Sequence, residues 1–194
     1  MSVKIVVDSA SEFSYEEAKA LGLYFCPLSV SFGDTEYRDS IDIDNKTFYE
    51  MLEASKDLPK TSQVGPFAFQ EAFEEIVENG HTAIAITLSS KLSGTYSSAR
   101  LAAQSFPGKI FLVDSLSATI GEKILILYAL ELTKTIDDPE EIVKRLEEKR
   151  EKIGICYLLD TLEYLHKGGR LSAAQALAGS ILSLKPLCTL TNGE

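Results

Sequence analysis

Residues 82–98, TAIAITLSSKLSGTYSS, hold the pattern that decides the fold of this chain. An apolar run rich in β-branched residues ends at Leu88, small polar residues follow, and a helical pattern begins near Thr95. Two more apolar runs, Val3–Val7 and Ile110–Val113, end in the same way and also lead into helical patterns. Repeated strand–loop–helix units are typical of a mostly parallel sheet flanked by helices. The sequence therefore predicts the α/β fold class.

Helix starts and one hairpin complete this prediction. Ser14 and Glu17 have the spacing of a capping box, Asp44 and Asp138 are suited to cap helices, and Pro66 stands at a first helical position. Apolar and polar residues alternate over 28–32 and are followed by a Gly-Asp turn, which predicts a hairpin strand with one solvated face.

Composition and charge exclude several classes of protein. The 194 residues are 45% hydrophobic and 25% charged, which is typical of globular domains and excludes disordered and fibrous chains. Lys and Arg number 19 against 29 Asp and Glu, which gives a net charge of −10. Such a chain repels phosphate backbones and anionic lipids at long range. We therefore expect no nucleic-acid partner.

Apolar runs and cysteines bear on the compartment. The most apolar stretch, Ile124–Leu132, is shorter than the roughly 20 apolar residues of a membrane span, so it predicts a buried helix and no stable membrane insertion. The first residues lack the features of a signal peptide. Cys26, Cys156 and Cys188 are far apart and form no Cys-x-x-Cys pair, so we expect neither a disulfide framework nor a metal site. Free thiols favour a cytoplasmic location.

A change of pattern near Lys152 predicts a domain boundary. We expect an α/β domain over residues 1–151 and the beginning of a second, α+β domain with antiparallel strands over residues 152–194. The later elements are predicted as a strand over 153–159, helices over 162–166 and 172–184, and a strand over 187–191. Domains below about 40 to 50 residues rarely close a core, and the hairpin signal Asn192-Gly193 has no return strand after it. The second domain is therefore expected to be incomplete.

The loop after Leu88 is the richest in hydroxyl groups. At the carboxyl end of a parallel strand, a helix N-terminus offers free N–H groups and a partial positive charge. Ser93 and Thr95 would add neutral donors, and Gly94 would allow close approach of a ligand to the backbone. An anion such as a carboxylate suits this site. The alternative is that the serines only cap the following helix.

Two further loops repeat parts of this chemistry. Lys60–Pro66, between two helical patterns, carries the hydroxyls of Thr61 and Ser62. Val7-Asp8-Ser9 and Val113-Asp114-Ser115 close two strands with the same residues, for which capping and hydrogen bonds to neighbouring loops are favoured over a remnant of duplication.

Candidates for acid–base catalysis are few. His81 and His166 have no carboxylate or nucleophile at informative spacing, and the carboxylates are spread along helix faces. Hydroxyl-rich loops without a base favour binding over catalysis. The alternative is an enzyme that acts on a small phosphorylated substrate bound at the helix N-terminus after Ser93.

Five segments, in this order, resemble the DegV family of bacterial fatty-acid-binding proteins. They are Val6–Ser9, Lys60–Gln63, Leu88–Tyr96, Val113–Ser115 and Leu165–Ser172. The resemblance covers all 194 residues, and its specific parts are the Ser93 loop and the Lys-Gly-Gly-Arg-Leu-Ser segment.

The resemblance implies a non-enzymatic lipid carrier of two domains that enclose one long-chain fatty acid, expected to have 14 to 18 carbons. The carrier would present the acid to a separate ATP-dependent fatty acid kinase, which makes an acyl phosphate. By resemblance, Thr61 and Ser93 bind the carboxylate, and Arg170 faces the kinase. The resemblance also implies that Ser62, Gly94 and Thr95 lie close to the carboxylate. The family's His-x-Gly-Pro-Gly segment has no counterpart in these residues. Family members usually carry Pro soon after Thr-Ser-Gln, whereas Val64 and Gly65 precede Pro66 in this sequence.

Overall fold

The computed structural model describes residues 2–171 and 185–194. Its centre is a four-stranded parallel sheet of β2 (Tyr24–Cys26), β1 (Val3–Asp8), β6 (Thr82–Thr87) and β7 (Ile110–Asp114), in that order. The apolar runs at β1, β6 and β7 predicted these strands, and the α/β fold class is confirmed.

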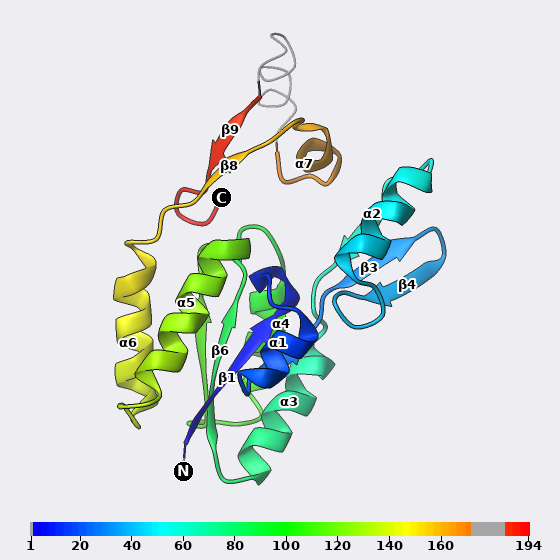
Figure 1. The fold of residues 1–194 in the computed structure, drawn as a ribbon. Coiled ribbons are helices and arrows are strands. Elements are labelled where there is room, and N and C mark those ends of the chain that lie inside the picture. Colours follow the sequence, from blue (N-terminus) through cyan, green and yellow to red (C-terminus); the bar gives the residue numbers. More distant parts are fainter. Residues whose placement is uncertain (1, 172–184) are drawn as a thin grey trace.

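Helices cover both faces of the sheet (Figure 1). α1 (Tyr15–Ala20), α5 (Thr119–Leu132) and α6 (Pro139–Arg150) pack on one face, against Ile5, Val7 and Ile84. α3 (Pro66–Glu78) and α4 (Thr95–Ala103) pack on the other, against Val6 and Ala85. Alternate strand residues thus serve two cores, as expected for a parallel sheet covered on both sides. The name body is used below for residues 2–151, except for the small lobe that the next paragraph describes.

A small lobe lies to one side of this sheet (Figure 1). β3 (Ser29–Phe32) pairs with β4 (Thr35–Arg38) as the predicted hairpin, and β5 (Lys60–Ser62) pairs antiparallel with the other edge of β3. α2 (Asn45–Ala54) packs beside them, with Asp44 as its cap. Residues 60–62 were expected in a loop. They form a strand because β3 offers them a free edge, which no short-range pattern in the sequence reveals.

The second segment comprises residues 152–171 and 185–194. It contains β8 (Cys156–Leu158), the short α7 (Glu163–Lys167) and β9 (Leu187–Thr189), which pairs antiparallel with β8. The predicted strands were longer than those observed, and beyond β8 the Leu159 N–H donates to the Pro186 carbonyl over 3.0 Å without extending the ladder. The predicted helix over 172–184 lies outside the described residues.

The other helix predictions are largely correct. Ser14 and Glu17 form a capping box, Asp138 caps α6, and Pro66 begins α3. The prediction of a buried helix over 124–132 is wrong in part. α5 buries Leu125, Ile126 and Ala129, whereas Ile124 and Leu127 lie on its exposed side.

Candidate functional site

The carboxyl ends of β1, β6 and β7 meet at one edge of the sheet, and the loops that follow them are joined by hydrogen bonds. Ser115 N–H donates to the Thr87 carbonyl over 3.1 Å, and Ser89 N–H donates to the Ser117 carbonyl over 2.7 Å. Leu88 N–H donates to Asp8 Oδ2 over 2.9 Å. These bonds fix the position of the loop that carries Ser93.

Ser93 and Thr95 form a pair of hydroxyls at the start of α4. Their side-chain oxygens are 3.0 Å apart, and Thr95 N–H lies 3.3 Å from Ser93 Oγ. Thr95 is fully buried and Ser93 is half-buried, so Ser93 lies nearer the surface and Thr95 lies beneath it. Gly94 is the N-cap residue of α4 and adds no side chain above the free N–H groups.

The segment after β5 packs directly on this loop. Val64 N–H donates to Thr95 Oγ1 over 3.3 Å, and Gln63 Nε2 donates to Ser98 Oγ over 2.8 Å. A Cβ at Gly94 would lie 1.9 Å from Gln63 Oε1, so the Gln63 side chain packs directly on Gly94 and would have to move to admit a larger residue. The loops that carry Thr61 and Ser93, which are far apart in sequence, are thereby brought together.

Thr61 and Ser62 are exposed at the end of β5, where they pair with Val30 and Ser29. In the described part of the chain, neither hydroxyl makes a hydrogen bond. Both are therefore available to a ligand at this edge.

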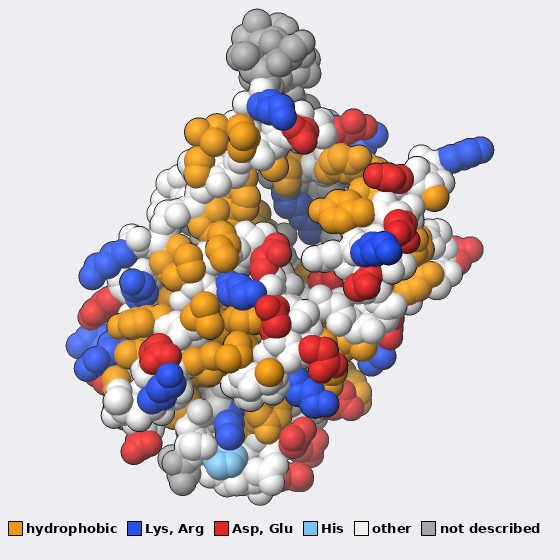
Figure 2. Space-filling model, viewed as in Figure 1, with side chains coloured by type: hydrophobic (Ala, Val, Ile, Leu, Met, Phe, Trp, Pro, Cys, Tyr) orange, Lys and Arg blue, Asp and Glu red, His pale blue; other side chains and the backbone are white. Residues whose placement is uncertain are grey.

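A larger, mostly apolar cavity of about 950 Å³ opens beside the Ser93 loop. Leu92, from that loop, forms one wall, and Leu159, Leu162, Leu165 and Leu187, from the second segment, are among the residues of the other. In Figure 2 hydrophobic side chains lie around a hollow between the lobe and the second segment. The volume is within the usual range for small-molecule sites.

Arg170 stands at this cavity, next to the Ser93 loop. Its Nε donates to the Leu92 carbonyl over 3.3 Å, and its Nη1 donates to the Gly168 carbonyl. The side chain is exposed, so it also remains open to solvent or to a partner. Further contacts hold the second segment to the body. Tyr157 Oη lies 3.1 Å from Thr119 Oγ1 and donates to the Ala118 carbonyl over 3.4 Å, and Ser89 Oγ donates to the Gly193 carbonyl over 2.6 Å.

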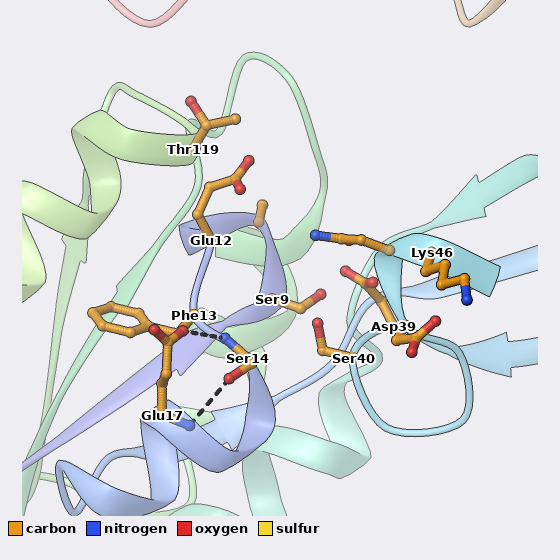
Figure 3. A pocket seen from close by; sticks show the side chains of 12 residues that line it. Ser9, Glu12, Phe13, Ser14, Glu17, Asp39, Ser40, Lys46 and Thr119 are labelled. Carbon is orange, nitrogen blue, oxygen red and sulfur yellow. Dashed lines mark hydrogen bonds between the residues drawn. The ribbon is translucent and has the colours of Figure 1, made fainter. Parts of the chain in front are cut away.

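A smaller cavity of about 520 Å³ has a different character. Figure 3 shows Glu12 and Thr119 on one side of it and Asp39, Ser40 and Lys46 on the other. Carboxylates and hydroxyls dominate its lining, so it is poorly suited to a fatty acid or a phosphate.

Buried carboxyl groups lie beneath the strand-end loops. Burial raises the pKa of Asp8 to about 7, although backbone N–H groups of Leu88 and Ala10 oppose the shift. Burial, together with repulsion from Asp8 and Asp114, raises the pKa of Glu122 well above its ordinary value. Burial also raises the pKa of Asp39.

Comparison with protein families identifies the chain. The family model described as "Uncharacterised protein, DegV family" matches residues 2–194. This chain belongs to the DegV family. The resemblance predicted from the sequence motifs is thereby confirmed.

Relatives of known sequence and structure support the same assignment. A DegV domain-containing protein of Deinococcus radiodurans is 36% identical over 194 residues, which are 100% of this chain and 69% of the relative. A structure described as fatty acid binding of a DegV family protein from Thermus thermophilus matches with a TM-score of 0.90 and 34% identity, over 100% of this chain and 69% of that one. The structure of DegV, a fatty acid binding protein from Bacillus subtilis, matches with a TM-score of 0.87, 36% identity and the same coverage.

Within the described ranges, none of the helices in this DegV-family chain has the length and apolar character needed to span a membrane. The described residues likewise contain no group of three or more His, Cys, Asp or Glu side chains arranged to hold a metal ion.

One contact of the site in this DegV-family chain was not predicted from the sequence, and a second was predicted in part. Gln63 joins the two loops that carry hydroxyl groups, but no local pattern in the sequence predicts its hydrogen bond to Ser98. The roles of Asp8 and Asp114 were partly predicted: each closes its own turn and also bonds to the loop after β6. The repeated Asp-Ser pair was the signal for both.

Proposed function

We propose that this chain binds a long-chain fatty acid of 14 to 18 carbons, with its carboxyl group at the loops of Thr61 and Ser93. The observation that carries the proposal is the pair of neutral hydroxyls, Ser93 and Thr95, beside a largely apolar cavity of about 950 Å³. Fatty-acid binding described for the relatives from Thermus thermophilus and Bacillus subtilis supports it. A structure from Eubacterium ventriosum is described as a stearic-acid-binding protein, which supports the chain length.

The hydrogen-bond directions favour an acceptor at Ser93. Thr95 Oγ1 already accepts a hydrogen bond from Val64 N–H, so its own proton is free to point at Ser93 Oγ. Ser93 can then donate its proton outward to a carboxylate. Thr61 and Ser62 would donate from β5, and the partial positive charge at the N-terminus of α4 would attract the same carboxylate.

Most of the binding free energy would come from the acyl tail. Each buried CH₂ contributes about 0.8 kcal/mol, whereas a hydrogen bond to a charged group contributes roughly 1.5 to 3 kcal/mol. A head group held only by hydrogen bonds stays reactive, because its charge is not neutralised by a fixed ion pair.

We further propose that this protein is a carrier and that a separate cytoplasmic kinase carries out the chemistry. The kinase would transfer the γ-phosphoryl group of ATP to a carboxylate oxygen, which yields an acyl phosphate and ADP. Arg170 is exposed and bonds to the Ser93 loop through the Leu92 carbonyl, which supports a role for it in contacting the kinase. The cavity between body and second segment supports a domain boundary at residues 151 and 152, with the ligand between the two parts.

Native mass spectrometry of the freshly purified protein tests the ligand class. We expect an added mass equal to one acid of 14 to 18 carbons. Added fatty acids should also raise the melting temperature, whereas phosphate esters should not. A ligand-free mass with protection by phosphate esters alone would instead support an enzyme that uses the N-terminus of α4 as its phosphate site.

Replacing Ser93 tests the site itself. Ser93→Ala should weaken fatty-acid binding and lower acyl-phosphate formation by roughly 10- to 100-fold, the equivalent of one hydrogen bond to a charged group. Titration with a fluorescent fatty acid and a kinase assay measure the two effects. Ser97→Ala is the matched control, because Ser97 lies exposed on the first turn of the same helix. Equal losses in both variants would remove Ser93 from the site.

A further inference from the structure

The carboxylates at the two Asp-Ser strand ends accept hydrogen bonds from the same loop, which follows β6. β1 and β7 flank β6 in the sheet, and the carboxylates at their ends both reach the segment that follows β6. Asp8 Oδ2 accepts a hydrogen bond from Leu88 N–H over 2.9 Å, and Asp114 Oδ1 accepts one from Ser90 N–H over 3.2 Å. The two carboxylates therefore hold the residues on either side of Ser89, where the Ser93 loop begins.

Each carboxylate also closes its own turn. Asp8 Oδ1 accepts from Ala10 N–H over 2.9 Å, and Asp114 Oδ1 accepts from Leu116 N–H over 3.0 Å. Asp8 is fully buried, whereas Asp114 is half-buried. The geometry of three strand-end loops thus depends on these two side chains.

Glu122, from the first turns of α5, is the third member of this carboxyl cluster (Asp8, Asp114 and Glu122). Its side chain is fully buried, and neither carboxyl oxygen has a hydrogen-bond partner within residues 2–171 and 185–194. An ionised carboxylate in this position would be desolvated and unpaired, which is far less favourable than the neutral acid.

No cation of the described residues forms an ion pair with Glu122. On α6, Arg150 donates Nη1 to the Asp114 carbonyl over 2.7 Å, and on α5 itself Lys123 donates to the Glu12 carbonyl over 2.8 Å. The strand β6 carries no titratable side chain. On the lobe side, Asp39 adds further negative charge near Asp8. Arg150 is thus the cation at the Asp114 end of the cluster, and the charges that act on Glu122 itself are those of Asp8 and Asp114.

We propose that Asp8 and Asp114 are positioning residues for the Ser93 loop, and that Glu122 is a neutral acid whose ionisation loosens this loop and weakens ligand binding. The proposal rests on the proposed function for its ligand and on the hydrogen bonds above for its mechanism. Deprotonation places a third negative charge beneath the loop, where it repels both Asp carboxylates and the carboxylate of the ligand. Ligand binding and proton binding at the cluster are then linked and favour each other.

The direction of the pH effect follows from the raised pKa of Glu122. Between its unfolded and its folded pKa, the folded state holds more protons than the unfolded state, so stability falls as pH rises. Asp8, whose pKa is raised from 3.8 to about 7, acts in the same direction between these values. The contribution of each group is complete below its unfolded pKa and is lost above its folded pKa.

Glu122→Gln tests the proposal, because glutamine keeps the shape and cannot ionise. Between pH 5 and 9, we expect the dissociation constant of the fluorescent acid cis-parinaric acid to rise more steeply for the wild type than for the variant. One linked proton corresponds to a difference of up to about tenfold per pH unit. The ligand's own titration cancels in the ratio of the two proteins. The proposal would be overturned if the dissociation constant rose equally steeply with pH in the wild type and in Glu122→Gln.

Two measurements without ligand separate this test from that of the proposed function. The unfolding equilibrium constant and the amide exchange of residues 88–95, corrected for intrinsic rates, should rise with pH more steeply in the wild type than in Glu122→Gln. If the probe fails to bind either protein, the proposed function is wrong, whereas these two slopes still decide the role of the carboxyl cluster.

Asp114→Asn provides a second variant should Glu122→Gln not fold. It removes one like charge, so Glu122 should ionise more readily and the pH midpoint of loop exchange should move to lower pH. Asp44→Asn is the matched control, since Asp44 is an exposed cap that accepts from Thr47 N–H over 2.7 Å. It should leave the midpoint unchanged. Identical midpoints in wild type and Asp114→Asn would overturn the proposal.

Discussion

The body and the second segment are held together by different physical means. The body encloses two clusters of fully buried side chains on opposite faces of one sheet. In the second segment, Ile155 is the one buried hydrophobic residue among those described, and it packs against Gly121 of α5 in the body. Leu158 and Leu187, which pair across β8 and β9, are 68% and 67% exposed.

The second segment therefore depends on the body for its structure. A two-stranded sheet is marginal by itself in water. The second segment is therefore held to the body largely by polar contacts from Tyr157, Arg170 and Gly193. Mutations should accordingly separate into those that unfold the body, those that release the segment, and those that do neither.

The largest expected effect is in the body. Phe73 is fully buried on α3, and its ring lies 5.8 Å from that of Phe69 and 6.3 Å from that of Phe106. Phe73→Ala should lower the free energy of unfolding by about 3 to 5 kcal/mol, measured by urea denaturation. Leu187→Ala in the second segment is the control and should change it by less than about 0.5 kcal/mol. Similar losses in both would mean that the segment shares the core of the body.

An intermediate effect is expected where the two regions meet. Ser89→Ala removes the buried hydroxyl that donates to the Gly193 carbonyl, at a cost of about 1 to 3 kcal/mol to segment attachment. Limited proteolysis between residues 152 and 155 should become roughly 5- to 160-fold faster. Exposed Ser90 provides the control variant Ser90→Ala, which keeps its backbone bond to Asp114. Unchanged cleavage in Ser89→Ala would show that this contact does not hold the segment.

The smallest effect is expected at Tyr157. Tyr157→Phe removes a hydroxyl 3.1 Å from Thr119 Oγ1, which contributes about 0.5 to 1.5 kcal/mol. The same proteolysis should accelerate roughly 2- to 12-fold, while urea denaturation of the body stays the same. Tyr164→Phe, at an exposed position on α7, should change neither. A loss of body stability in Tyr157→Phe would erase the distinction between the two regions.

Local patterns predicted the body well. β-branched apolar runs marked β1, β6 and β7, and the caps at Ser14, Asp44 and Asp138 marked helix starts, because each signal depends only on neighbours in the sequence. The Asp-Ser repeat predicted capping and bonds to adjacent loops, and both are observed.

Features that depend on distant residues were not predictable in this way. β5 forms because β3 offers an edge, and Gln63 reaches Ser98 across 35 positions of sequence. The burial of Glu122 is equally hidden, since a glutamate in a first helical turn ordinarily lies exposed near the helix dipole. The exposure of Ile124 and Leu127 shows the converse case, an apolar run with only one face in the core.

The sheet order places β1 in the interior of the sheet, long before one of its two partners in the sequence. β1 pairs with β2 on one side, but its other partner, β6, ends 61 residues after Cys26. At 5 to 20 residues per second, a ribosome needs roughly 3 to 12 s to supply that partner. Throughout this interval one edge of an apolar strand stays open to pairing with other chains. The rate of translation between residues 27 and 87 therefore sets how long each new molecule is exposed to aggregation.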